Sequence, residues 1–101
     1  MEGRRKLMEE RAKQIAELLR LLANEHRLLI LCALSDSSLT VGEIHSHTPG
    51  ISASALSQHL SHLKAAGLVE SEKRGMNVIY TLSDRRIAAL IDAIKEQYCG
   101  D

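Results

Sequence analysis

The stretch SASALSQHLSHLKAAGLV, residues 52–69, carries the clearest structural pattern of the chain. Ser52 can accept a hydrogen bond from a backbone amide of the following turn, so it is well suited to begin a helix. Gly67 readily adopts the left-handed backbone that ends many helices. One apolar stripe at helical spacing is formed by Leu56, Leu60 and Leu63. The pattern therefore predicts a helix near residues 53–66.

A shorter helix is predicted just before this one. Thr40 and Glu43 have the spacing of a capping box, in which each side chain accepts a hydrogen bond from the backbone amide of the other residue. The helix must end before Pro49-Gly50, because proline disfavours helical backbone in the preceding residue. Two helices joined by such a tight turn indicate a helix-turn-helix.

Residues 68–82 have the pattern of a β-hairpin. Two runs of strand-forming residues flank Gly75-Met76-Asn77, a sequence suited to a turn. Ser83 is predicted to cap a last helix near residues 84–98. The apolar face of that helix is formed by Ile87, Leu90, Ile91, Ile94 and Tyr98.

Two further helices are predicted upstream. A helix near residues 7–22 carries an apolar stripe, and Asn24 can cap a second helix that ends in the polar run 35–38. Cys32 lies on the apolar face of this second helix and is expected to point inward. A short strand is also expected near Leu39. The fold class predicted is mainly α with a small β-hairpin, a winged helix-turn-helix in the order α-α-α-α-β-β-α.

The composition of the 101-residue chain fits a single domain, residues 1–101, with an aliphatic core, because Trp and Phe are absent. Acidic and basic residues balance to a formal net charge of zero. This balance disfavours a protein that coats nucleic acid through overall positive charge, so any DNA contact must be local. The sequence has no apolar run of membrane-spanning length and no signal-peptide core, so we expect a cytoplasmic protein without membrane association.

The side of the 53–66 helix opposite Leu56 carries small and hydrogen-bonding residues. Such a face can approach the major groove closely and offer amide and hydroxyl groups to base edges. Gln58 is the best candidate to read a base, since a glutamine amide can bind adenine through two hydrogen bonds. The other residues on or beside this face are Ser54, Ser57, Ser61, His62 and Ala65.

Contacts to the DNA backbone are expected from neighbouring positions. Ser52 with the free amides at the helix start suits a phosphate oxygen, as does Lys64. Lys73 and Arg74, beside the hairpin turn, can reach a flanking phosphate or the minor groove. An ordinary solvated helix face would have the same composition, so the helix alone leaves both interpretations open. The hairpin with basic residues near its tip favours binding to double-stranded DNA.

Four segments carry a family resemblance: LLANEHRLLIL at 21–31, SASALSQHL at 52–60, LKAAGLV at 63–69 and IYTL at 79–82. In order and spacing they resemble the ArsR/SmtB family of winged-helix transcriptional repressors, over about residues 18–83. The resemblance implies a homodimer built from the helices near 7–22 and 84–98. It also implies paired recognition helices that bind a palindromic operator and release it when an inducer is sensed.

Many members of that family sense metals, but two of its site types are not matched here. The thiolate type needs cysteine at the start of the third helix, where residues 40–43 read TVGE. The interfacial zinc type needs aspartate and histidine along the last helix, and residues 84–98 contain no histidine.

The five histidines also fail to suggest a metal site. His45 and His47 lie two positions apart on a helix and face different ways. His59 and His62 lie on or beside the expected DNA face, and His26 suits polar packing near the start of the second helix. We therefore expect neither a metal site nor a cofactor.

The two cysteines are Cys32 and Cys99. From the residues alone, Cys32 is a small buried hydrophobe and Cys99 an incidental thiol near the chain end. In their sequence contexts the pair resembles the dithiol branch of the ArsR/SmtB family. That resemblance implies that a persulfide or polysulfide inducer joins the two thiols through a sulfur bridge and lowers operator affinity.

Two alternatives stay open at this point, and a third is disfavoured. A trivalent metalloid or Cu(I) would also bind two thiolates, although such a site needs a third ligand. A winged-helix module that binds protein instead of DNA is compatible with zero net charge. An enzyme with Cys32 as nucleophile is disfavoured, because Cys32 lies on an apolar stripe and no glycine-rich loop is present, so we expect no enzymatic activity.

Overall fold

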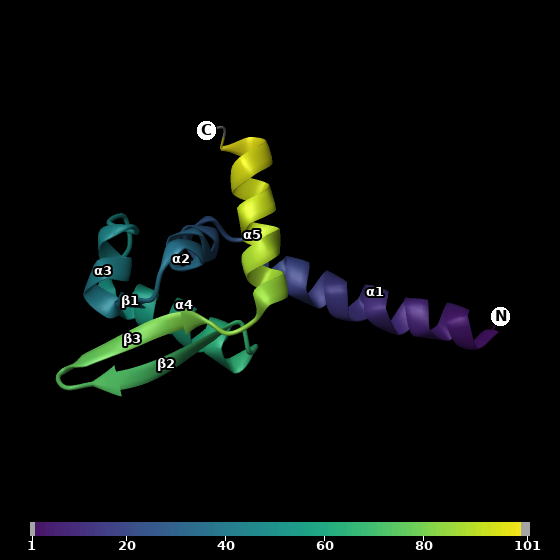
Figure 1. The fold of residues 1–101 in the computed structure, drawn as a ribbon, viewed down its shortest axis with the longest axis horizontal. Helices are drawn as coiled ribbons and strands as arrows, with labels where there is room; N and C mark the ends of the chain where they lie inside the picture. The colour runs from purple at the N-terminus through teal and green to yellow at the C-terminus, as the bar shows by residue number, and fades with distance from the viewer. Residues whose placement is uncertain (1, 100–101) are drawn as a thin grey trace.

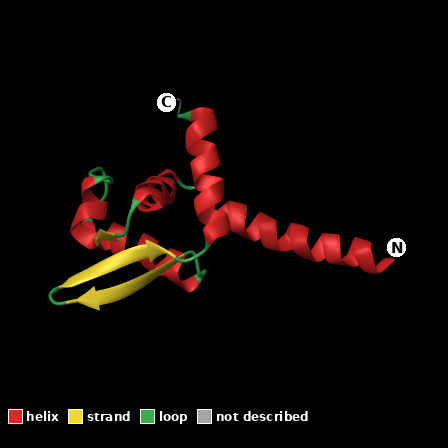
Figure 2. Cartoon of the chain, viewed as in Figure 1, coloured by secondary structure: helices red, strands yellow, loops and turns green. Residues whose placement is uncertain are grey.

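The computed structural model describes residues 2–99, which form five helices and three strands (Figures 1 and 2). The prediction of a mainly α fold with a β-hairpin is confirmed. In chain order the elements are α1 (Glu2–Leu22), α2 (Glu25–Asp36), β1 (Leu39–Thr40), α3 (Val41–Ser46), α4 (Ala53–Ala65), β2 (Val69–Arg74), β3 (Asn77–Leu82) and α5 (Arg85–Tyr98).

The helix starts follow the predicted caps with one exception. Asn24 Oδ1 accepts hydrogen bonds from two backbone amides of α2, and Ser52 Oγ accepts one from the start of α4. Thr40 forms the expected capping box at α3. The last helix is capped by Asp84 and not by Ser83 as predicted, because the Ser83 hydroxyl donates to the carbonyl of Gly67 instead.

The strand near Leu39 is present and adds a third strand to the hairpin. The antiparallel sheet has the order β1-β3-β2, and β1 pairs with β3 through Leu39 opposite Tyr80. The order α-α-α-α-β-β-α is therefore incomplete, because β1 stands between α2 and α3. Gly75 turns the β2–β3 hairpin with a φ of +62°, a left-handed conformation that favours glycine.

The core is aliphatic, as the composition predicts. Leucines of α4 lie in one buried cluster with apolar residues of α2, α3 and α5. Gly67, just after α4, has a φ of +79°. Fully buried side chains include Ile30, Leu31, Ile44, Leu56, Leu63 and Ile91. This packing fixes which side of α4 faces outward.

Helix α1 is longer than predicted, since it begins at Glu2 and not near residue 7. It extends away from the rest of the molecule, and only its C-terminal end meets the other helices (Figure 1). Among α1 residues, Leu22 is buried in the core, whereas Ile15 and Leu19 remain about half exposed. Most of this helix is therefore unpartnered in the single chain.

Candidate nucleic-acid interface

Helix α4 presents an exposed polar face because its three buried leucines fix the opposite face in the core. The structure leaves the polar side chains that the sequence predicts on this helix exposed to solvent, and Ala65 beside them is exposed as well. The polar side chains are Ser54, Ser57, Gln58, Ser61, His62 and Lys64. The face offers hydroxyl, amide and imidazole groups with little bulk, which is the chemistry that a major-groove surface needs.

Two of the predicted phosphate-contacting groups already have intramolecular partners. Ser52 Oγ accepts from the Ala55 amide at 3.1 Å, so it serves as the helix cap. Lys64 Nζ donates to Ser71 Oγ at 2.7 Å, which joins α4 to β2. Both side chains remain exposed, and the Lys64 contact fixes the hairpin relative to the polar face of α4.

The hairpin formed by β2 and β3 carries the two predicted basic residues at its tip. Lys73 and Arg74 are exposed, and they point to opposite faces because side chains alternate along a strand. Arg74 Nη2 contacts Glu72 at 3.2 Å, so part of its charge is neutralised. Met76, in the turn, is 99% exposed. Lys73 therefore supplies much of the positive charge at this end of the molecule.

Arg27 is a contributor that the sequence pattern did not indicate. Its backbone amide bonds to the Asn24 cap, and its Nη1 donates to the Leu21 carbonyl at 3.2 Å. Its Nη2 lies 3.2 Å from Nδ1 of His62 on α4. The guanidinium thus links the junction of α1 and α2 to the exposed face of α4.

Two more histidines lie next to this contact. The rings of His26 and His59 are 5.8 Å apart between centroids, and Nδ1 of His59 is buried without a hydrogen-bond partner among the described residues. Burial lowers the pKa of His59, and the charges of Arg27, His26 and His62 act in the same direction. His59, a residue of α4, is therefore held as a neutral ring near neutral pH.

The two cysteines lie on the packed pair α2 and α5. Cys32 is half-buried against the core, which agrees with the prediction that it points inward, and Cys99 is exposed at the end of α5. Burial raises the pKa of the Cys32 thiol, Lys95 lowers it, and Cys99, Asp36 and Asp92 raise it. Because α2 packs against α5, the fold carries both thiols on one pair of adjacent helices.

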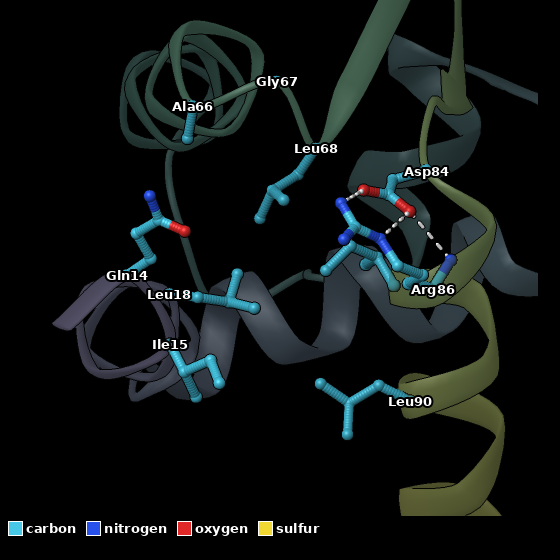
Figure 3. Close-up of a pocket in the computed structure, with 10 residues that line it drawn as sticks. Gln14, Ile15, Leu18, Ala66, Gly67, Leu68, Asp84, Arg86 and Leu90 are labelled. Carbon is cyan, nitrogen blue, oxygen red and sulfur yellow. Dashed lines mark hydrogen bonds and ion pairs between the residues drawn. The ribbon is translucent and has the colours of Figure 1, made fainter. Parts of the chain in front are cut away.

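A groove of about 370 Å³ lies between α1 and α5. Figure 3 shows Ile15, Leu18 and Leu90 pointing into the space between the two helices. At its edge Arg86 Nη2 contacts Asp84 at 2.8 Å, and hydrogen bonds from Arg86 lower the pKa of Asp84 to about 2. The groove continues the exposed apolar surface of α1, which includes Leu7, Met8, Ile15 and Leu19.

Within residues 2–99 no three histidine, cysteine or acidic side chains are arranged so that they could hold a metal ion. None of the helices in the same range has the length and apolar character needed to cross a bilayer.

Comparison with known proteins places this geometry in a family. Residues 24–71 match the model described as "Bacterial regulatory protein, arsR family". The chain is 45% identical over 92 residues to the transcriptional activator HlyU of Vibrio cholerae, covering 91% of this chain and 84% of that protein. The structure of reduced HlyU from Vibrio cholerae superposes with a TM-score of 0.86 at 44% identity, covering 93% of this chain and 98% of that chain.

Two further solved structures are similar. The transcriptional repressor BigR from Xylella fastidiosa has a TM-score of 0.84 at 33% identity, with 96% of this chain and 98% of that chain covered. The homodimeric winged helix-turn-helix DNA-binding domain Mb0332 from Mycobacterium bovis has a TM-score of 0.74 at 30% identity, with 87% of this chain and 81% of that chain covered. The chain therefore belongs to the ArsR family of winged helix-turn-helix transcriptional regulators.

Proposed function

We propose that the chain, as one domain over residues 1–101, is a homodimeric repressor that binds a palindromic operator and releases it when reactive sulfur species modify Cys32 and Cys99. The observation that carries the DNA-binding part is the exposed polar face of α4 together with a hairpin that bears basic residues at its tip. The family supports it, since its members regulate transcription by binding DNA.

Within this proposal the residues divide by role. Gln58 reads a base edge at the centre of the polar face, where a bidentate contact to adenine gives sequence discrimination. Phosphate contacts come from Ser52, from the exposed flank of Lys64 and from Lys73 and Arg74 on the hairpin. Supporting hydrogen bonds along α4 come from Ser54, Ser57, Ser61 and His62.

A second copy of this chain is the proposed occupant of the groove between α1 and α5. Helix α1 leaves Met8, Ile15 and Leu19 more than half exposed, which is costly for a free helix and ordinary for an interface. A similar solved domain, Mb0332, is described as homodimeric. A two-fold dimer places paired recognition helices at half-sites about 34 Å apart, one turn of DNA.

The proposed release step is a sulfur transfer that needs no other oxidant. The Cys32 thiolate attacks a sulfane sulfur of the polysulfide, an S–S bond breaks, and the shorter polysulfide leaves with the electron pair. The Cys99 thiolate then attacks a sulfur of the chain now held by Cys32, and hydrosulfide leaves. Two thiols have been oxidised, their protons have gone to solvent, and sulfane sulfur has been reduced.

The bridge acts on the geometry of the dimer and not on the reading face. Cys32 lies in α2, which packs beneath α4, whereas Cys99 ends α5, which faces the proposed partner copy. Joining the two thiols couples the position of the recognition helix to that of the dimer helices. A dimer that no longer matches the half-site spacing binds the operator more weakly.

The chain acts in this proposal as a binding protein and not as an enzyme, in keeping with relatives that are transcriptional regulators. A test uses fluorescence anisotropy on duplexes tiled across the DNA upstream of the protein's own gene, with reduced and with polysulfide-treated protein. Saturable binding of the reduced protein to one duplex, weakened by polysulfide and restored by dithiothreitol, is the expected result. Equal weakening by arsenite or Cu(I) would instead favour metalloid or copper sensing, and no affinity for any duplex at low salt would favour a protein-binding module.

A further inference from the structure

Lys95 lies on α5 one helical turn before Cys99, and its side chain reaches across to the end of α2. Its Nζ donates to Ser35 Oγ at 3.2 Å and to the Asp36 carboxylate at 3.1 and 3.2 Å. A cation at the C-terminal end of a helix also interacts favourably with the helix dipole. Lys95 therefore fastens α5 to the last turn of α2.

Hydrogen bonds on both ends of Lys95 link it to the backbones of the two cysteine residues. The Cys99 amide donates to the Lys95 carbonyl at 3.0 Å. The Lys95 Nζ donates to Ser35 Oγ, which itself donates to the Cys32 carbonyl at 2.7 Å. Moving the end of α5 beyond the reach of the Lys95 side chain would break these links.

We propose that Lys95 is a positioning residue for the thiol pair, holding the Cys99 end of α5 beside Cys32 and supplying the positive charge that favours the Cys32 thiolate. This inference rests on the proposed function, because it matters for regulation only if the two thiols are the sensor.

The charge distribution around Cys32 supports the electrostatic half of this role. The groups that act on the Cys32 thiol are Lys95, Cys99, Asp36 and Asp92, and Lys95 is the cation among them. Burial and the three acidic groups disfavour the thiolate by raising the Cys32 pKa, and Lys95 opposes them. Asp36 both binds the ammonium and raises the pKa of Lys95, so the positive charge is held in place and retained.

The chemical consequence follows from the first step of sulfur transfer. Only the thiolate of Cys32 attacks the sulfane sulfur, so a lower thiolate fraction slows the attachment of the sulfur chain to Cys32. The second step needs the Cys99 thiolate within reach of that chain, which depends on where α5 ends. Lys95 serves both steps and exchanges no proton or sulfur itself.

The experiment measures Cys32 alone, without DNA or polysulfide. In full-length protein carrying Cys99→Ser, the rate of alkylation by iodoacetamide is followed by mass spectrometry from about pH 6 to about pH 10, a range that brackets thiol titration. Lys95→Gln removes the charge and keeps a donor for Ser35 and Asp36. Lys95→Arg keeps the charge. Arg85→Gln is the matched control, because it removes one exposed positive charge from the same helix about 15 Å along the axis.

The expected result is that Lys95→Gln raises the pH of the alkylation inflection and slows the reaction near neutral pH about three- to tenfold. Lys95→Arg should restore the rate to within about twofold, and Arg85→Gln should leave it unchanged. An unchanged inflection in Lys95→Gln, with helix content and thermal midpoint equal to the parent protein, would overturn the electrostatic role. That outcome leaves the proposed function standing, because the proposed function is tested separately, by whether Cys32→Ser protein still loses DNA on polysulfide treatment.

The positioning half is tested with Lys95→Met in the protein with both cysteines, because methionine removes both the charge and the donor. Mass spectrometry after polysulfide treatment should show Cys32 carrying added sulfur but a smaller fraction of the Cys32–Cys99 bridge than in Lys95→Gln. Equal bridge fractions in the two variants would show that the hydrogen bonds of Lys95 do not position Cys99.

Discussion

Nη2 of Arg27 lies 3.2 Å from Nδ1 of His62, on the exposed face of α4. A guanidinium donates hydrogen bonds and accepts none, so Nδ1 of His62 is the acceptor and the ring carries its proton on Nε2. The exposed imidazole therefore offers a donor of fixed identity beside Gln58, four residues earlier on the same helix. A residue at the start of α2 thus sets the chemistry of the proposed DNA-reading face.

Replacing Arg27 with methionine should lower operator affinity by about 1 kcal/mol, or roughly fivefold, because His62 loses the contact that fixes its tautomer. Methionine keeps an apolar side chain at this half-buried position. Anisotropy titrations of the single variants and of Arg27→Met with His62→Ala form a double-mutant cycle. If Arg27→Met costs as much affinity in the His62→Ala background as in the parent, the effect does not pass through His62.

Replacing Gln58 with alanine should weaken operator binding by about 1 to 3 kcal/mol and leave binding to random duplex nearly unchanged, because the lost contact is to a base edge. Lys73→Ala should weaken binding to both duplexes alike and reduce the salt dependence of binding, because the lost contact is to a phosphate. Titrations of both variants on both duplexes at several salt concentrations separate the two effects. A Gln58→Ala protein with parental affinity and sequence preference would mean that another face of α4 meets the bases.

Polysulfide should lower operator affinity of the parent protein about 5- to 150-fold, the usual range for coupled sites. Cys32→Ser and Cys99→Ser should each abolish this response and keep reduced-state affinity, because neither residue lies on the polar face of α4. Mass spectrometry of the parent should show a crosslink within one chain that carries extra sulfur. Release from DNA in the protein lacking both cysteines would place the sensor elsewhere.

Replacing Ile15 with glutamate should convert the dimer to monomer in sedimentation experiments, because the charge would stand in the apolar surface of α1 that the partner copy covers. Met76→Glu is the matched control, since Met76 is more exposed than Ile15 but lies at the hairpin tip. Parental association of the Ile15→Glu protein at micromolar concentration would contradict the proposed interface.

Acid should destabilise the protein through His59. The fold lowers the pKa of His59, so as the pH falls below about 6.5 the unfolded chain binds more protons than the folded chain and the free energy of unfolding decreases. Phenylalanine at position 59 cannot titrate and keeps an aromatic ring beside His26. Urea unfolding at about pH 7.5 and about pH 5.5 should show a smaller loss of unfolding free energy at the lower pH in His59→Phe than in the parent. His47→Gln, at an exposed position, is the control. Equal losses in parent and His59→Phe would assign the acid sensitivity to other groups.

The helix-turn-helix and its polar face were predictable because the signals that define them are local. The cap of Asn24, the capping box at Thr40 and the cap of Ser52 each act within one helical turn, so a short sequence window contains the whole interaction. The leucine stripe of α4 fixes which residues face outward, since periodicity alone determines the side of a helix. Gly67 and Gly75 take the left-handed conformations that their positions in the sequence indicate.

The contacts that the sequence did not reveal all join distant segments. Ser83 has the composition of a cap, yet its hydroxyl bonds to the Gly67 carbonyl sixteen residues away, and Asp84 caps α5 instead. The sequence predicts the strand near Leu39 but not its partner, and the fold pairs it with β3. The links from Arg27 to His62 and from Lys95 to Asp36 span 35 and 59 residues. The sequence by itself determined the helices and the exposed side of α4, because local backbone and side-chain preferences suffice for them. Only tertiary packing decided which charged side chains contact the reading face and the thiols, because those contacts join segments far apart in the chain.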